Sequence, residues 1–169
     1  VGNNGGGFFG VNSAHPFENP NAISNVLQML LMLLIPTSLP FTYGKMVGNA
    51  KQGKILFAAM LMIFVVFLGT ALFSESQGNS RLSEIGLDQT NGSMEGKEVR
   101  FGTVQSTLYA IVTTASETGA VNTMHDTLSP ITGMLTLSNM LLNTIFGGVG
   151  AGFMNIIMYA MIAVFLSGL

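Results

Sequence analysis

The last 43 residues of the chain, 127–169, contain no charged side chain. One straight helix over this stretch would be roughly 60 Å long, about twice the hydrocarbon thickness of a bilayer. Four of the six residues 147–152 are glycine, and each disfavours a helix interior by about 1 kcal/mol relative to alanine. We therefore expect two apolar arms, residues 131–146 and 153–168, with a break between them inside the membrane. Lipid tolerates such a break only where protein or a water-filled cavity surrounds it.

Composition extends this conclusion to the whole chain. Charged residues make up 8% and hydrophobic residues 49%, whereas soluble domains carry about 25% charged residues. The sequence therefore predicts an all-α integral membrane protein. The net charge of −2 gives no reason to expect a nucleic-acid partner. The chain has no initiator methionine and ends within an apolar run, so we expect it to be a fragment of a longer protein.

The elements follow in a recognisable order. Residues 23–47 and 55–73 predict two transmembrane helices, and residues 74–100 form a polar segment. Residues 101–115 are too few to cross a bilayer and predict a re-entrant half-helix, with residues 116–126 as its return loop. A transmembrane helix, a re-entrant pore helix, a filter loop and a broken transmembrane helix together make a potassium-channel-like pore unit. Residues 1–48 would then be the filter loop and outer helix of one unit, and residues 49–169 nearly all of the next.

Basic residues predict the orientation. The turn at residues 48–53 is flanked by lysines and lacks acidic residues, so we expect it to be cytoplasmic. Segment 74–100, with three basic and five acidic residues, would be extracellular. The half-helix would therefore enter the membrane from outside.

A short pattern occurs twice. Val-Asn-Ser-Ala-His at 11–15 is matched by Val-Asn-Thr-Met-His at 121–125, and each copy follows a glycine-bearing loop. Glycine lets a backbone turn its carbonyl oxygens toward one point, and a ring of such oxygens replaces the water of a potassium ion. The loops therefore predict a cation site. The alternatives are that the glycines only make tight turns, or that residues 5–7 hold a phosphate.

Other residues admit two interpretations. Glu117 is the one acid expected inside the membrane, which marks it as functional; it either attracts ions or supports the loop from behind. His15, Glu18, His125 and Asp126 either assemble a metal site or brace the loops, and we favour bracing. The glycine break provides either close helix packing or a gate.

Four longer motifs carry a resemblance. They are G-G-G-F-F-G-V-N-S-A-H-P-F-E-N-P (5–20), M-E-G-K-E-V-R-F-G (94–102), G-A-V-N-T-M-H-D (119–126) and F-G-G-V-G (146–150). The chain resembles the potassium-binding A subunit of the bacterial Kdp potassium-transporting ATPase over its whole length. Members of this family have four pore units around one selectivity filter, and this chain would supply parts of the second unit and most of the third.

The resemblance implies roles for particular residues. The filter of the second unit would use Asn4, Gly5 and Gly6, and that of the third Glu117, Thr118 and Gly119. A relative has Ser-Cys where this chain has Glu117-Thr118, so the ion affinity of this chain need not equal that of the relative. The loop below the filter would contain Gly147, Gly148, Gly150 and Gly152, and the bracing residues would be His15, His125 and Asp126.

The resemblance also implies the biological setting. The transported ligand would be potassium, with no covalently bound cofactor. The partners would be a P-type ATPase catalytic subunit and small accessory membrane subunits, in the bacterial plasma (inner) membrane. The subunit itself would be non-catalytic. The alternatives are a passive or ion-coupled potassium transporter without an ATPase, and a membrane scaffold.

Overall fold

The computed structural model covers residues 1–169 and describes residues 7–11, 13–147 and 151–169. The described part is helical, with no β-strand assigned within it. In chain order its helices are α1 (Ala22–Met46), α2 (Ala50–Ser76), α3 (Ser80–Glu84), α4 (Gly102–Ala115), the 3₁₀ helix η1 (His125–Thr127), α5 (Pro130–Leu142) and α6 (Ala151–Ser167).

The two longest helices, α1 and α2, form a hairpin. Asn21 caps α1 with a reciprocal capping box to Ser24, which satisfies two backbone N–H groups at the start of the helix. Both helices are long and apolar enough to cross a membrane. The expected all-α fold with membrane-spanning helices is therefore confirmed. Helix α1 is shifted by one residue from the predicted range 23–47, and α2 extends beyond the predicted range 55–73 at both ends.

Glycines bring the two arms of the hairpin together near its turn. A Cβ on Gly53 would meet the backbone carbonyl oxygen of Pro40, and one on Gly44 would lie 3.0 Å from the nitrogen of Gly53. Only glycine allows the two backbones to approach so closely.

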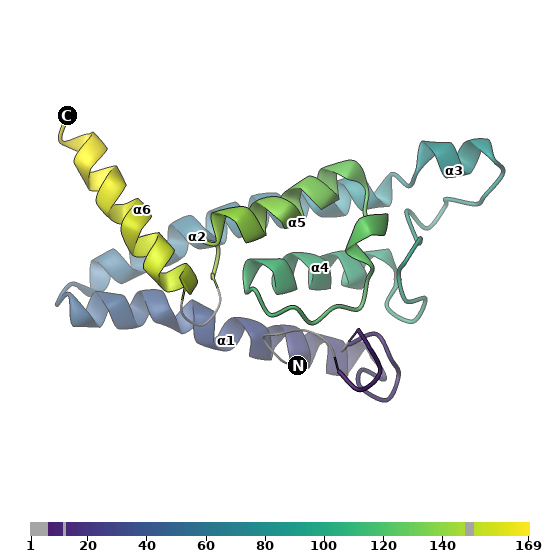
Figure 1. Cartoon of the computed structure of the whole chain (residues 1–169), viewed down its shortest axis with the longest axis horizontal. Coiled ribbons are helices and arrows are strands. Elements are labelled where there is room, and N and C mark those ends of the chain that lie inside the picture. Colours follow the sequence, from purple (N-terminus) through teal and green to yellow (C-terminus); the bar gives the residue numbers. More distant parts are fainter. Residues whose placement is uncertain (1–6, 12, 148–150) are drawn as a thin grey trace.

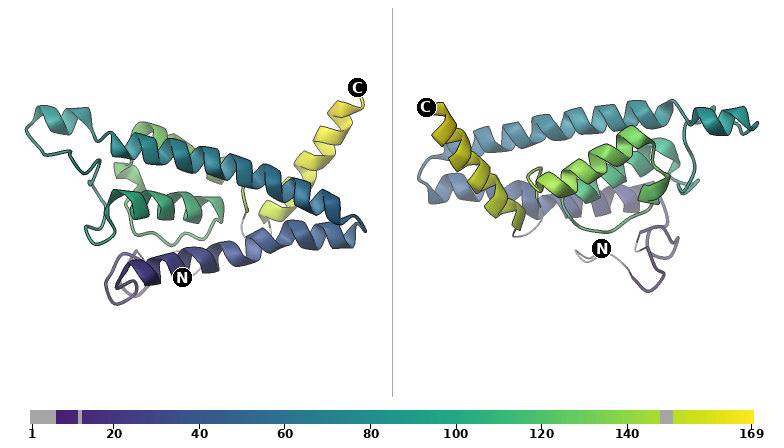
Figure 2. Two further views of the ribbon diagram at one scale, coloured as in Figure 1. Left: turned by 180° about the vertical axis from the view of Figure 1, so that it is seen from behind. Right: turned by 45° about the horizontal axis from the view of Figure 1, so that its top comes forward.

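Helix α4 occupies the centre. It contacts α1, α2 and α5, and Figure 1 shows it between α1 on one side and α2 and α5 on the other. Figure 2 shows the same enclosure from behind, with α6 diverging from the bundle. Nine of the 14 residues of α4 are buried, which makes this short helix the most enclosed of the helices in the described part of the chain.

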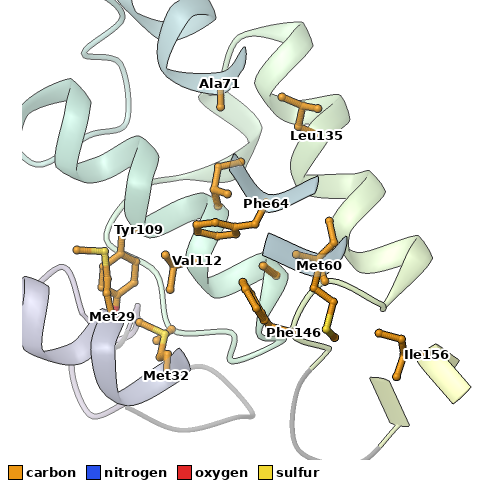
Figure 3. Packing of buried hydrophobic residues seen from close by; sticks show 14 residues of the cluster. Met29, Met32, Met60, Phe64, Ala71, Tyr109, Val112, Leu135, Phe146 and Ile156 are labelled. Carbon is orange, nitrogen blue, oxygen red and sulfur yellow. The ribbon is translucent and has the colours of Figure 1, made fainter. Parts of the chain in front are cut away.

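The apolar core forms around α4 (Figure 3). Tyr109 and Val112 of α4 pack in one cluster with Met29 of α1, Phe64 of α2 and Leu135 of α5. Within a bilayer such contacts stabilise the fold through van der Waals packing rather than through removal of water, because lipid tails are as apolar as these side chains. Many apolar residues of α1, α2, α5 and α6 face outward instead, as expected of helices that meet lipid or neighbouring protein.

The break in the last apolar stretch differs from the prediction. Helix α5 ends at Leu142 rather than at residue 146, because Asn143 adopts a left-handed conformation with φ 46° and closes the helix. Asparagine is one of the few non-glycine residues that adopt this conformation readily. Helix α6 already begins at Ala151, inside the glycine run, so the predicted arms 131–146 and 153–168 are both misplaced at the break.

Candidate ion-binding loop

The candidate site begins where α4 ends. The backbone N–H of Ser116 donates to the carbonyl of Val112 at 3.0 Å, and that of Thr118 donates to Thr113 at 3.0 Å. The loop thus leaves directly from the C-terminal end of the helix, where the helix dipole places partial negative charge. A cation beside this end would be favoured.

The backbone of the loop is unusual at two positions. Glu117 has φ 52° and Gly119 has φ 76°, with Thr118 between them. A left-handed conformation costs a residue such as glutamate of the order of 1–3 kcal/mol, and it persists where the surroundings enforce it. Gly119 adopts the same conformation without a Cβ clash and is exposed.

The two hydroxyl groups of the loop nearest to the end of α4 are already engaged. Ser116 Oγ donates to the carbonyl oxygen of Val112 at 2.8 Å and lies 2.8 Å from Thr118 Oγ1. Both residues are buried. The oxygens that remain for an external ligand are therefore mainly those of the backbone and of Glu117.

A cavity of about 370 Å³ lies against the loop. Glu117, Gly119 and His125 line it together with Thr113 of α4 and Met140 of α5. Thr113 Oγ1 and His125 Nε2 are buried and have no hydrogen-bond partner within the described residues. The structure thus brings three predicted site residues, Glu117, Gly119 and His125, to one cavity.

The two histidines have different surroundings. Burial lowers the pKa of His125, and the neighbouring Asp126 carboxylate acts in the opposite direction. His15 stacks on Phe9 with ring centroids 4.0 Å apart, and its Nδ1 accepts the backbone N–H of Phe17 at 3.2 Å. Asp126 is exposed.

The structure does not support the interpretation of the histidines and neighbouring carboxylates as a metal site. Within residues 7–11, 13–147 and 151–169, no three His, Cys, Asp or Glu side chains are grouped as metal ligands. His15, Glu18, His125 and Asp126 all belong to this part of the chain, so they are not assembled into such a group.

Several predicted residues lie outside the described ones, namely Asn4, Gly5, Gly6, Gly148 and Gly150. The two described glycines of the break touch each other: a Cβ on Gly147 would lie 2.5 Å from the Cα of Gly152, and a Cβ on Gly152 would meet the backbone of Gly147. The start of α6 is therefore packed directly on the residue that leads into the break.

Sequence reasoning missed two groups around the loop. One is the buried ion pair between Glu75 and Lys97, both of which lie in the segment 74–100 that the sequence predicts only as polar and extracellular. The other is a set of buried amides that includes Asn25 and Asn122. The available signals were an asparagine in the first turns of an apolar helix and the asparagine inside the repeated Val-Asn pattern.

Spanning helices that enclose a short buried helix and its strained loop define an α-helical membrane protein. The model of the KdpA family, the potassium-transporting ATPase A subunit, matches residues 1–169, and the chain belongs to this family. It is accordingly a membrane protein of potassium transport and part of the Kdp ATPase complex. The resemblance stated from the sequence motifs is thus confirmed.

Proposed function

We propose that residues 117–119 form part of a potassium selectivity filter, which binds extracellular potassium and passes it into the membrane toward a P-type ATPase partner. The main support is the loop at the C-terminal end of α4, in which Glu117 and Gly119 are left-handed on either side of Thr118. Successive residues that alternate between left-handed and right-handed backbone conformations can direct their carbonyl oxygens toward one side. Such oxygens replace the hydration shell of potassium.

Electrostatics favours the same assignment. The C-terminal end of α4 contributes partial negative charge, as half-helices do at cation sites of transporters. The hydroxyls of Ser116 and Thr118 bond to each other, which stiffens the loop. By this proposal residues 101–115 act as the pore helix, and Asn4, Gly5 and Gly6 serve the preceding unit in the same way.

Substitution of Gly119 tests the filter. Gly119→Asp in the complete protein adds a Cβ at φ 76° and a negative charge, so it should weaken potassium uptake or reduce discrimination against rubidium and sodium. The matched control is Gly86→Asp, where φ is 87° and no atom lies within 4 Å of the added Cβ. Wild-type affinity and selectivity in Gly119→Asp would remove this residue from the filter.

The break between α5 and α6 is assigned to a gate below the filter. The end of α5 lies close to the candidate filter, because Met140 lines the same cavity as Glu117 and Gly119. Gly147 contacts Gly152 at the start of α6. Gly152→Ala should push the two apart and alter the transport rate while potassium binding at the filter is retained. Unchanged transport at normal expression would leave the glycines only a packing role.

The remaining parts of the proposal concern the complex. The chain would be a non-catalytic subunit, with ATP hydrolysis on the partner, small accessory subunits beside it and the assembly in the bacterial inner membrane. Purification of the complete protein from membranes tests this: a P-type ATPase should accompany it. Potassium transport without such a partner would favour the passive or ion-coupled alternative.

A further inference from the structure

A buried amide in α1 joins segments far apart in the sequence. The Asn25 side chain is 0% exposed, and its Oδ1 accepts from Asn19 Nδ2 at 2.8 Å and from Asn122 Nδ2 at 2.9 Å. Its own Nδ2 donates to Gln105 Oε1 of α4 at 3.3 Å. One side chain therefore bonds to the segment before α1, to α4 and to the loop after α4.

Asn122 is the partner closest to the candidate filter. It follows Gly119 by three positions and is 2% exposed, and Thr123 Oγ1 donates to its Oδ1 at 3.3 Å. At its other end the loop is fixed by the hydrogen bond from Thr118 N to Thr113 O. The bond to Asn25 thus holds the outgoing end of the loop.

The segment before α1 is tied to α4 as well. The Tyr109 hydroxyl lies 2.6 Å from Ser13 Oγ and 3.0 Å from Gln28 Oε1. Arg100, just before α4, donates through Nε to the carbonyl oxygen of Asn19 at 3.2 Å. Residues 13–19 follow the first glycine-bearing loop, so the chain leaving one candidate filter loop is bonded to the pore helix of the next.

We propose that Asn25 is a positioning residue that holds the outgoing end of the loop 117–119 in a fixed relation to residues 13–19, so that the ion selectivity at this loop depends on a side chain of the neighbouring pore unit. This inference rests on the filter function proposed above. Selectivity of a carbonyl ring depends on where its oxygens are held. A buried hydrogen-bond network fixes such positions strongly, because an amide that loses its partner there is left unsatisfied.

The test is a double-mutant cycle on the complete protein in its assembled complex. The variants are Asn25→Ala, Asn122→Ala and the two combined. The measured quantity is the apparent KM for rubidium divided by that for potassium, in stimulation of ATP hydrolysis. We expect each single change to lower this ratio at least about threefold, and the double change to lower it no further than the stronger single one, since both remove the same bond.

Asn21→Ala is the control for helix stability. Asn21 caps the same helix through Ser24 N at 3.0 Å, so its loss should lower the melting temperature and leave the ratio unchanged. If the complex with Asn25→Ala does not assemble, the ratio of KM values measured for Asn122→Ala alone tests the proposal.

Two results would overturn the proposal: an unchanged ratio in Asn122→Ala, or effects of the two single changes that multiply in the double variant. Gly119→Asp, measured in parallel, separates this failure from failure of the filter. Altered selectivity in Gly119→Asp together with normal selectivity in Asn122→Ala rejects only the role of Asn25.

Discussion

Lys97 Nζ lies 2.7 Å from Glu75 Oε2, and neither side chain is accessible to solvent. The other carboxylate oxygen of Glu75 accepts the backbone N–H of Ser129 at 2.8 Å, and Lys97 forms an isolated β-bridge with Thr123. The last turn of α2, the segment before α4 and the start of α5 therefore meet at one charged pair. The bridge to Thr123 joins the outgoing part of the candidate loop to this anchored pair.

Removal of one partner should be costly. Lys97→Ala leaves the Glu75 carboxylate buried without its countercharge, and the expected loss of stability is about 3–5 kcal/mol. The melting temperature of the purified protein measures the loss. The double variant Glu75→Leu with Lys97→Met removes both charges and should be markedly more stable than Lys97→Ala. A Lys97→Ala protein as stable as wild type would show that the pair is not buried in the membrane-bound protein.

The close contact in the α1–α2 hairpin gives a second prediction. Gly53→Ala places a Cβ against the carbonyl of Pro40, and such overpacking costs about 1–3 kcal/mol. Gly69→Ala is the matched control in the same helix, because no atom lies within 4 Å of its added Cβ. That change should stabilise the helix by up to about 1 kcal/mol. Equal melting temperatures for the two variants would contradict the close contact.

His125 should make stability depend on pH. Burial lowers its folded-state pKa below the unfolded value of about 6.5, so the folded protein binds fewer protons than the unfolded chain. The contribution of neutral His125 to stability is present above a pH of about 6.5. It is lost as the pH falls from that value toward the folded-state pKa of His125.

The measurement is the change in melting temperature between neutral and mildly acidic solution, for wild type and for His125→Gln. On acidification the melting temperature of the wild-type protein should fall more than that of His125→Gln. Asp126→Asn should enlarge the loss, because the Asp126 carboxylate raises the pKa of His125. A loss of the same size in wild type and His125→Gln would remove the imidazole as the cause.

Orientation is tested by labelling. The chain contains no cysteine, so cysteines introduced at the exposed positions Gln52 and Leu87 report without background from this chain. Position 52 should react with an impermeant reagent only from the cytoplasm, and position 87 only from outside. The reverse pattern would invert the proposed direction in which α4 enters the membrane.

Helix positions were predictable because they depend on local signals. Uncharged runs long enough for a bilayer located α1 and α2, and a helix is present at Gly102–Ala115 where a short one was expected. The end of α5 was not predicted, because it is set by the φ of 46° at Asn143 rather than by the more conspicuous glycines that follow.

Contacts between residues far apart in the chain could not be predicted from the sequence. Nothing local distinguishes Lys97, which is buried, from Arg81, which is exposed in the same polar segment. Asn25 and Asn122 are 97 positions apart, and only the packing of α1 beside α4 makes them neighbours. The repeat marked Asn122 as part of a pattern but gave no information about its partner.

The enclosure of α4 has a consequence for biogenesis. A helix of 14 residues with buried Ser106, Thr107, Thr113 and Thr114 is too short to span the bilayer and has no stable place among lipids. The α1–α2 hairpin is synthesised before α4 and offers it a protein surface, and α5, made after α4, closes the other side. Each segment is therefore translated when the surface that it packs against is already present. A mutation that slows formation of the α1–α2 hairpin should leave α4 exposed to quality-control proteases before α4 can pack against it.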